Sequence, residues 1–345
     1  MQISLGCVIS AAAIVFLLQK VSLQQVAQQL SSAEPLPILL LVAAVIGSLV
    51  TRAIRWGIFF LPDRHVPLRP LFGTLAISYM ASTFLPLRAG ELLRPVFLGQ
   101  RAGLSAPRVL ATILLEKLFD FLALAVMLAL LVATTPLPDL AQAAGVTITT
   151  FILVGFGFVV GLAIWRTPTL KLVGFAESRL PLGLGGRLRL GEAARQFAEG
   201  TDPLRVPRVW ALLLSWSAIT WLFALASGWF GALALGVHLG VPALLFLTVL
   251  TSTGQAVPSS PGYLGVYHAA ATFALTFFGI DNALALAIAL VTWAVTYGTL
   301  VVVGLIAFWT GGYTFRDLLA GARGQGTRMK TAPISADPLH LAPDS

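Results

Sequence analysis

Charged residues are scarce in this sequence. Asp, Glu, Lys and Arg together make up 10% of its 345 residues, whereas a soluble globular domain carries about 25%. Hydrophobic residues reach 57%, the mean hydropathy is +0.89, and several apolar runs approach the roughly 20 residues that a helix needs to cross the hydrocarbon core. The composition therefore excludes an ordinary soluble enzyme and predicts an all-α polytopic integral membrane protein.

Cysteine and histidine are also rare, which limits the chemistry that the chain could support. The single cysteine, Cys7, excludes a disulfide framework and a cysteine metal site. No Gly-rich nucleotide loop is present, and no basic face is interleaved with aromatic residues as in nucleic-acid binding. The histidines lack the spacing of a zinc site; they are His65, His238, His268 and His340. We expect no metal, no cofactor, no nucleic-acid partner and no enzymatic activity.

The apolar segments are of two kinds. Two stretches, 71–98 and 243–279, are each broken near their middle by a Pro/Gly-containing turn. No basic residue precedes the first long run, so we expect that run to remain as a membrane span and not to be cleaved as a signal peptide. The long runs predict about six full transmembrane helices, at approximately 3–18, 37–61, 110–132, 146–165, 210–236 and 283–309.

The basic residues indicate how these segments cross the membrane. Cytoplasmic loops carry an excess of Lys and Arg, and the two regions that flank the first broken stretch, 52–69 and 88–108, are both basic. If 71–85 crossed completely, the second of these regions would be external. If the stretch instead enters the membrane, turns inside it and returns, both basic regions lie on the same side. We therefore predict a re-entrant helical hairpin at 71–98; the alternative for such a broken stretch is a merely kinked or short helix.

The same reasoning predicts a second re-entrant hairpin at 243–279, which begins and ends on the opposite, neutral side. The two opposed hairpins suggest an inverted repeat, a pattern found around transport sites, and both termini are then cytoplasmic. We divide the chain into a membrane domain, 1–312, and a polar tail, 313–345, expected to be disordered. Within the membrane domain, the basic region 166–208 is either an amphipathic segment on the cytoplasmic leaflet or an ordinary loop.

Charged residues follow the turn of the first hairpin. Arg88, Glu91 and Arg94 are spaced by three residues, so they share one face if the segment is helical. Charges at membrane depth are costly and mark functional sites by default. We interpret this cluster as a candidate polar site.

Two further groups of charges lie near the ends of apolar runs. Glu116, Lys117 and Asp120 either begin a helix at the interface or form ion pairs with the arginines of the first hairpin. Arg52 and Arg55 are expected to extend to the interface as topology anchors.

The second hairpin is polar without being charged. Its prolines and glycines leave backbone groups unpaired, and these groups could bind a head group. A lone histidine such as His268 more often makes a structural hydrogen bond than it ionises. The polar residues around this turn are Gln255, Ser259, Ser260, Tyr263, Tyr267 and His268.

Three motifs carry a family resemblance. The segment 86–94, Pro-Leu-Arg-Ala-Gly-Glu-Leu-Leu-Arg, resembles the P-x-R-x-G-E-x-x-R element of the lysylphosphatidylglycerol synthase transmembrane region, also called flippase-like. The segment 116–120 resembles its E-[RK]-x-x-D element, and 258–266 resembles its P-x-x-P-G-x-x-G element. In order and over about 1–312, the three motifs are fairly specific.

The resemblance implies movement of an aminoacylated phospholipid, or of another phospholipid or lipid-linked head group, between leaflets of the bacterial cytoplasmic membrane. We expect this chain to lack the soluble aminoacyl-transferase domain of the bifunctional synthases and not to synthesise lysylphosphatidylglycerol by itself. The alternatives are an enzyme or accessory factor of a polyprenyl-phosphate or glycolipid pathway, and a scaffold for a lipid synthase. Expected partners are anionic membrane lipids, a separate synthase or a second copy of the chain.

The head-group site implied by this resemblance draws on both hairpins and on the segment that follows the first. The residues from the first half are Arg88, Glu91, Arg94, Glu116, Lys117 and Asp120, and those from the second hairpin are Pro258, Ser259, Ser260, Pro261, Gly262, Tyr263, Gly265 and His268. The family often has an acidic residue where His268 stands.

Overall fold

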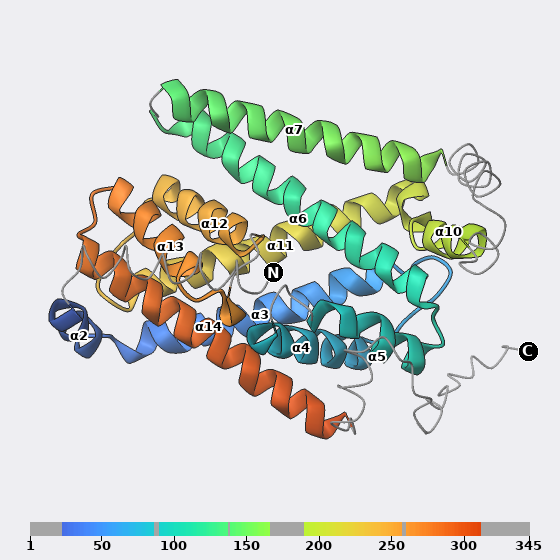
Figure 1. Cartoon of the computed structure of the whole chain (residues 1–345), viewed down its shortest axis with the longest axis horizontal. Helices are drawn as coiled ribbons and strands as arrows, with labels where there is room; N and C mark the ends of the chain where they lie inside the picture. Colours follow the sequence, from blue (N-terminus) through green and yellow to red (C-terminus); the bar gives the residue numbers. More distant parts are fainter. Residues whose placement is uncertain (1–22, 86–89, 137–138, 166–189, 257–259, 312–345) are drawn as a thin grey trace, which may run out of the picture.

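A computed structural model describes residues 23–85, 90–136, 139–165, 190–256 and 260–311. These residues form helices and turns and contain no strand, which confirms the predicted all-α class (Figure 1). The helices are α2 (Leu23–Ser31), α3 (Pro35–Ile58), α4 (Leu68–Phe84), α5 (Leu93–Ala102), α6 (Ala106–Thr134), α7 (Asp139–Ile164), α10 (Leu190–Glu199), η2 (Asp202–Arg205), α11 (Pro207–Leu233), α12 (Val241–Ala256), η3 (Pro261–Tyr263), α13 (Val266–Phe277) and α14 (Asn282–Thr310).

Five of the described helices are long and apolar enough to cross a membrane: α3, α6, α7, α11 and α14. Proline occupies the first turn of α3, α6 and α11. A backbone N–H at this position has no acceptor within the helix, so proline, which lacks the N–H, removes no hydrogen bond there. The sixth predicted span, 3–18, lies outside the described residues, as do the tail 313–345 and the part 166–189 of the basic loop.

The two broken stretches form the two predicted short helix pairs. The 17 residues of α4 and the 16 residues of α12 each extend about 25 Å at 1.5 Å per residue. Their returning partners, α5 and α13, have 10 and 12 residues and extend about 15–18 Å, well short of the roughly 30 Å hydrocarbon core. Both pairs therefore turn back inside the bundle.

The two helix pairs point toward each other. In Figure 1, α4 and α5 enter from the end where α3 and α14 finish, whereas α12 and α13 enter from the end where α14 begins. Their tips meet near the middle, where η3 packs against α4. This opposed arrangement agrees with the predicted inverted repeat of hairpins.

The ends of the bundle differ in charge. The end at which α3, α5 and α14 finish, here the basic end, carries seven arginines among the described residues: Arg64, Arg69, Arg101, Arg108, Arg195, Arg205 and Arg208. Arg101 donates a hydrogen bond to the carbonyl of Gly311 there. The described part of the opposite end, here the neutral end, contains α2 and the turns 134–136, 234–240 and 278–281, without any Lys or Arg.

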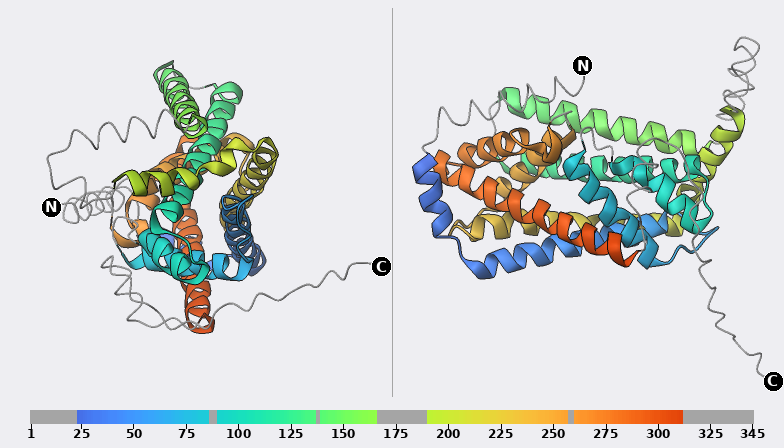
Figure 2. Two further views of the ribbon diagram at one scale, coloured as in Figure 1. Left: turned by 90° about the vertical axis from the view of Figure 1, so that its right-hand side faces the viewer. Right: turned by 60° about the horizontal axis from the view of Figure 1, so that its bottom comes forward.

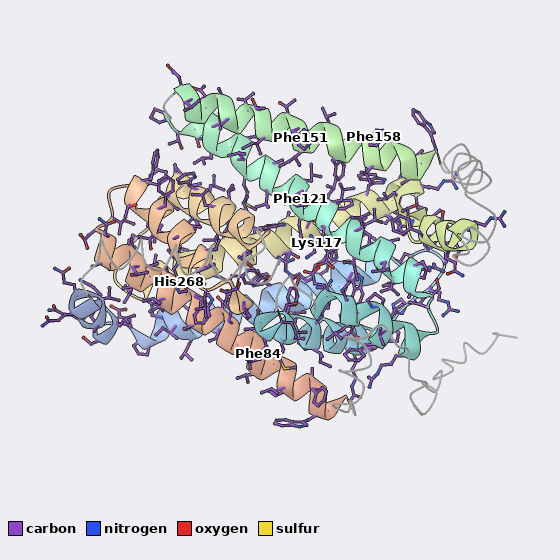
Figure 3. The ribbon with its side chains drawn as sticks, viewed as in Figure 1. Phe84, Lys117, Phe121, Phe151, Phe158 and His268 are labelled. Atoms are coloured by element: carbon purple, nitrogen blue, oxygen red, sulfur yellow. The ribbon has the colours of Figure 1, made fainter. Side chains whose placement is uncertain are left out.

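Close helix contacts hold the core together, and one long helix lies outside it. Main contacts join α3 to α11 and α4 to α14, where a side chain at Gly304 would meet Met80 and the carbonyl of Ala76. In contrast, α7 packs mainly along α6 at the periphery (Figure 2). Its Phe151 and Phe158, labelled in Figure 3, are mostly exposed, as expected of a surface that faces lipid.

Candidate functional site

A cavity of about 270 Å³ lies where the two hairpins meet. Its lining comes from both halves of the chain, and the two contributions differ. The charged side chains are supplied by the first half: Arg52 of α3, Glu91 before α5, and Lys117 and Asp120 of α6. The lining residues of α12, η3, α13 and α14 are uncharged.

Asp120 joins α6 to α3 through two arginines. Its Oδ1 accepts a hydrogen bond from Nη2 of Arg55 at 2.8 Å, and its Oδ2 lies 3.4 Å from Nη1 of Arg52. Arg55 is completely buried and also donates to Ser217 of α11. Arg52 lies against the ring of Trp221, 5.8 Å from its centroid.

The prediction that Arg52 and Arg55 anchor the helix at the interface is therefore wrong. The spacing of three residues places both side chains on the face of α3 that meets α6, and Asp120 holds them inside the protein. The carboxylate partner lies more than sixty positions away in the sequence, which is why local context did not reveal it.

Glu116 and Arg94 form the most buried ion pair. Nη1 of Arg94 is 2.8 Å from Oε2 of Glu116, and the exposed fractions of their side chains are 0% and 1%. The guanidinium also donates from Nε to Ser78 at 3.1 Å and lies over the rings of Trp56 and Tyr79, at 5.5 Å and 5.2 Å from their centroids. The structure thus confirms the ion-pair interpretation of Glu116, and Arg94 stands behind the cavity without lining it.

Lys117 and Glu91 form a pair that the cavity can reach. Nζ of Lys117 donates to Oε1 of Glu91 at 2.7 Å, and both side chains are partly exposed. Figure 3 shows Lys117 near the middle of the bundle. Arg88, the third charge predicted with this hairpin, lies outside the described residues. The pair joins α6 to the turn that precedes α5.

Glycine accounts for the shape of both hairpins. A side chain at Gly90 would collide with the backbone of α4 at Ser78 and Ser82, so glycine allows the first hairpin to close. In the second hairpin, Gly262 and Gly265 have φ values of +66° and +84°, which non-glycine residues rarely adopt. The carbonyl of Gly262 accepts a hydrogen bond from the Trp293 indole at 2.7 Å.

Some of the residues predicted at the second hairpin line the cavity, and others do not. Tyr263, Tyr267 and Gln255 line the cavity, whereas His268 is buried against Trp293, away from it. Ser260 donates to the carbonyl of Leu264 at the tip, next to Pro261. Pro258 and Ser259 lie outside the described residues.

The sequence did not reveal the contribution of α14 to this wall. Tyr297 lines the cavity and donates from its hydroxyl to Oε1 of Gln255 at 3.2 Å. Thr296 lies beside it in the lining. Both residues occur in a long apolar span without a recognisable motif. The adjacent threonine and tyrosine, which are polar residues inside a membrane span, were the signal that could have revealed them.

The charges of the described site nearly balance. Arg52, Arg55, Arg94 and Lys117 face Asp120, Glu91 and Glu116, which gives a formal charge of +1. In the described part of the chain, no three His, Cys, Asp or Glu side chains gather as a metal site. Arg52 and Lys117 line the cavity together with their partners Asp120 and Glu91, so an anion would bind these cations by replacing a carboxylate.

The fold and the cavity define a polytopic membrane protein with a charged site inside the bundle, at the meeting point of two re-entrant hairpins. The family of the lysylphosphatidylglycerol synthase TM region matches residues 3–304, and the chain belongs to this family. Comparison with curated proteins and with solved structures found no match.

Proposed function

We propose that this protein moves an anionic phospholipid or lipid-linked head group between the two leaflets. The observation that carries this proposal is the cavity between the opposed hairpin tips, which is lined by two cations, Arg52 and Lys117, each in an ion pair with a carboxylate. A head group crossing the hydrocarbon core needs such a polar site, because an unpaired charge there is costly. The membership in the lysylphosphatidylglycerol synthase TM region family supports a role with lipids.

The cavity volume suits a head group and not a whole lipid. At about 270 Å³ it lies near the lower limit of ligand pockets, which span about 300–1,000 Å³. The acyl chains of the lipid would therefore remain in the bilayer. The phosphate would bind Arg52 and Lys117, exchanging with Asp120 and Glu91 as their partners.

The placement in the cell is part of the same proposal. The basic end would face the cytoplasm of a bacterial inner membrane, following the excess of Lys and Arg on that side, and both chain termini would lie there. The protein would move its lipid without chemical change, alone, with a second copy, or beside a synthase that makes the lipid.

The experiment is leaflet-resolved lipid movement in proteoliposomes. Phosphatidylglycerol with a fluorescent acyl chain is reconstituted with the protein, and a membrane-impermeant reductant reports the outer fraction over time. Arg52→Ala and Lys117→Ala should each slow movement at least about tenfold, as expected for the loss of a charge-assisted contact of about 1.5–3 kcal/mol. Arg52→Ala leaves Asp120 paired with Arg55, so the fold should persist.

The matched control is Arg108→Ala, which breaks an ion pair with Asp63 at the basic end, outside the cavity. Its movement rate should stay close to that of the wild type. Equal rates in the wild type, Arg52→Ala and Lys117→Ala would refute the assignment of the site. Absence of movement for every anionic lipid would refute transport and favour an accessory role in lipid synthesis.

A further inference from the structure

The helices on the two sides of α7 and α10 occur in the same order. In each half a long helix is followed by a short helix pair and a second long helix: α3, α4, α5 and α6 in the first half, and α11, α12, α13 and α14 in the second. Corresponding helices have similar lengths, for example 29 residues in both α6 and α14. They run in opposite directions between the basic end and the neutral end (Figure 1). The two halves are therefore related as an inverted repeat.

Each short helix pair packs against the last long helix of the other half. The helix α4 lies along α14, and α12 lies along α6. Between these two contacts, α3 packs against its counterpart α11, where a side chain at Gly47 would collide with the ring of Phe223. If the two halves had the same internal arrangement, the α4–α14 contact and the α6–α12 contact would be equivalent.

The two contacts differ in how closely the helices approach. The α4–α14 contact, here the tight contact, is extensive, and a Cβ at Gly304 would lie 2.4 Å from Cβ of Met80 and 2.9 Å from the carbonyl oxygen of Ala76. The α6–α12 contact, here the loose contact, is smaller. It is made by a cluster of apolar side chains that includes Leu131 of α6 and Leu245 of α12, and α6 contains no glycine that would let the backbones approach.

The cavity extends to the loose contact and ends before the tight one. Its lining includes Leu124 of α6 and Leu247 and Thr248 of α12, whereas Met80 and Gly304 of the tight contact do not line it. The tight contact lies between the cavity and the basic end, where α4 begins and α14 finishes. The described conformation is therefore closed toward the basic end.

We infer that the protein has a second conformation, in which the two contacts exchange their packing: α12 closes on α6, and α4 separates from α14. The inference rests on the proposed function, for which it supplies the conformational step. The cavity is reached from the neutral end in the described conformation and from the basic end in the second one. The α3–α11 contact persists in both, because it joins corresponding helices and an exchange of the halves leaves it unchanged.

The variant Gly304→Ala tests the exchange, because its methyl group meets Met80 and Ala76 only while the tight contact is closed. The readout is the labelling of one cysteine at the cavity by a membrane-impermeant maleimide, added to vesicles that expose either the basic or the neutral end. Ser252→Cys introduces this cysteine into the lining, and Cys7→Ala removes the single native one. We expect Gly304→Ala to raise the ratio of basic-end to neutral-end labelling at least about fivefold, because the added methyl group overpacks only the described conformation.

Two other glycine variants are the controls. Gly298→Ala changes the same helix at a position with open space around it, and should leave the labelling ratio at the wild-type value. Gly47→Ala places a similarly crowded methyl group against Phe223 in the α3–α11 contact, which both conformations share. It should lower stability without changing the ratio. The inference is overturned if Gly304→Ala leaves the ratio unchanged, or if Gly47→Ala raises it as much as Gly304→Ala does.

A distance measurement tests the inference even if Gly304→Ala does not fold. Spin labels on introduced cysteines are placed at exposed ends of the two contacts, Arg69 with Trp309 at the basic end and Thr134 with Val241 at the neutral end. We expect two distances for each pair, and the longer distance should become more frequent at one pair as it becomes rarer at the other between detergent and bilayer.

The outcomes of the distance measurement separate the inference from the proposed function. A single distance at both pairs, in detergent and in bilayers, would overturn the inference, and lipid movement by such a protein would leave transport standing. Opposite changes at the two pairs without movement of any lipid in proteoliposomes would leave the two conformations standing and remove the flippase function.

Discussion

Breaking the Arg94–Glu116 ion pair should destabilise the protein severely. Both side chains are essentially inaccessible, so the variant Arg94→Met leaves a carboxylate without a partner in the interior. Removing one member of a buried pair costs about 3–5 kcal/mol. The loss of the cation that lies over Trp56 and Tyr79 falls within this total. Ser78 keeps its own hydrogen bond to the carbonyl of Gly90 and adds little.

The assay is reversible unfolding in mixed micelles, followed by the fluorescence of the chain's eight tryptophans. The double variant Arg94→Met/Glu116→Leu should be more stable than Arg94→Met alone, because no uncompensated charge remains. Arg108→Met provides the control: Asp63, its partner, is 48% exposed, and an exposed pair contributes only about 0–1 kcal/mol. The reasoning is refuted if Arg94→Met costs no more than Arg108→Met, or if the double variant is no better than the single one.

Three substitutions test the turns and caps by the same unfolding measurement. Gly90→Ala should lower the free energy of unfolding by about 1–3 kcal/mol, since a Cβ there meets the backbone of α4. The control Gly73→Ala, with open space around it, should not destabilise the protein. Equal losses of stability in the two variants would contradict the packing argument. Gly262→Ala should cost about 1–2 kcal/mol because of its positive φ. Asp281→Ala removes the acceptor for two N–H groups at the start of α14 and should cost about 1 kcal/mol, whereas Asp281→Asn should retain most of that stability.

The architecture was largely predictable because it follows from hydropathy and charge distribution. Long apolar runs gave the spans, and the requirement that 52–69 and 88–108 lie on one side gave the first hairpin. Glycines and prolines marked both hairpin turns. These signals are local in the sequence, and in a bilayer they determine directly which segments cross and on which side the loops lie.

The site was predictable only in part, because its partners are distant in sequence. Glu91 and Lys117 were expected as members, but their pairing depends on how the first hairpin packs against α6. Arg52 was misinterpreted because a basic residue near a helix end more often serves as an anchor. Tyr297 was missed because its role depends on the neighbour that α12 provides.

The arginines of α3 have a consequence for how the chain enters the membrane. Arg55 and Arg52 precede their partner Asp120 by 65 and 68 residues, so the ribosome synthesises both arginines well before that carboxylate. An arginine at the centre of a helix costs about 2.5–3.5 kcal/mol to insert. The two residues lie three and six positions before the last residue of α3, close enough for their side chains to extend to the interface at first. We expect that Asp120 draws both guanidinium groups inward once α6 has inserted, which would couple the assembly of the site to the order in which the helices are synthesised.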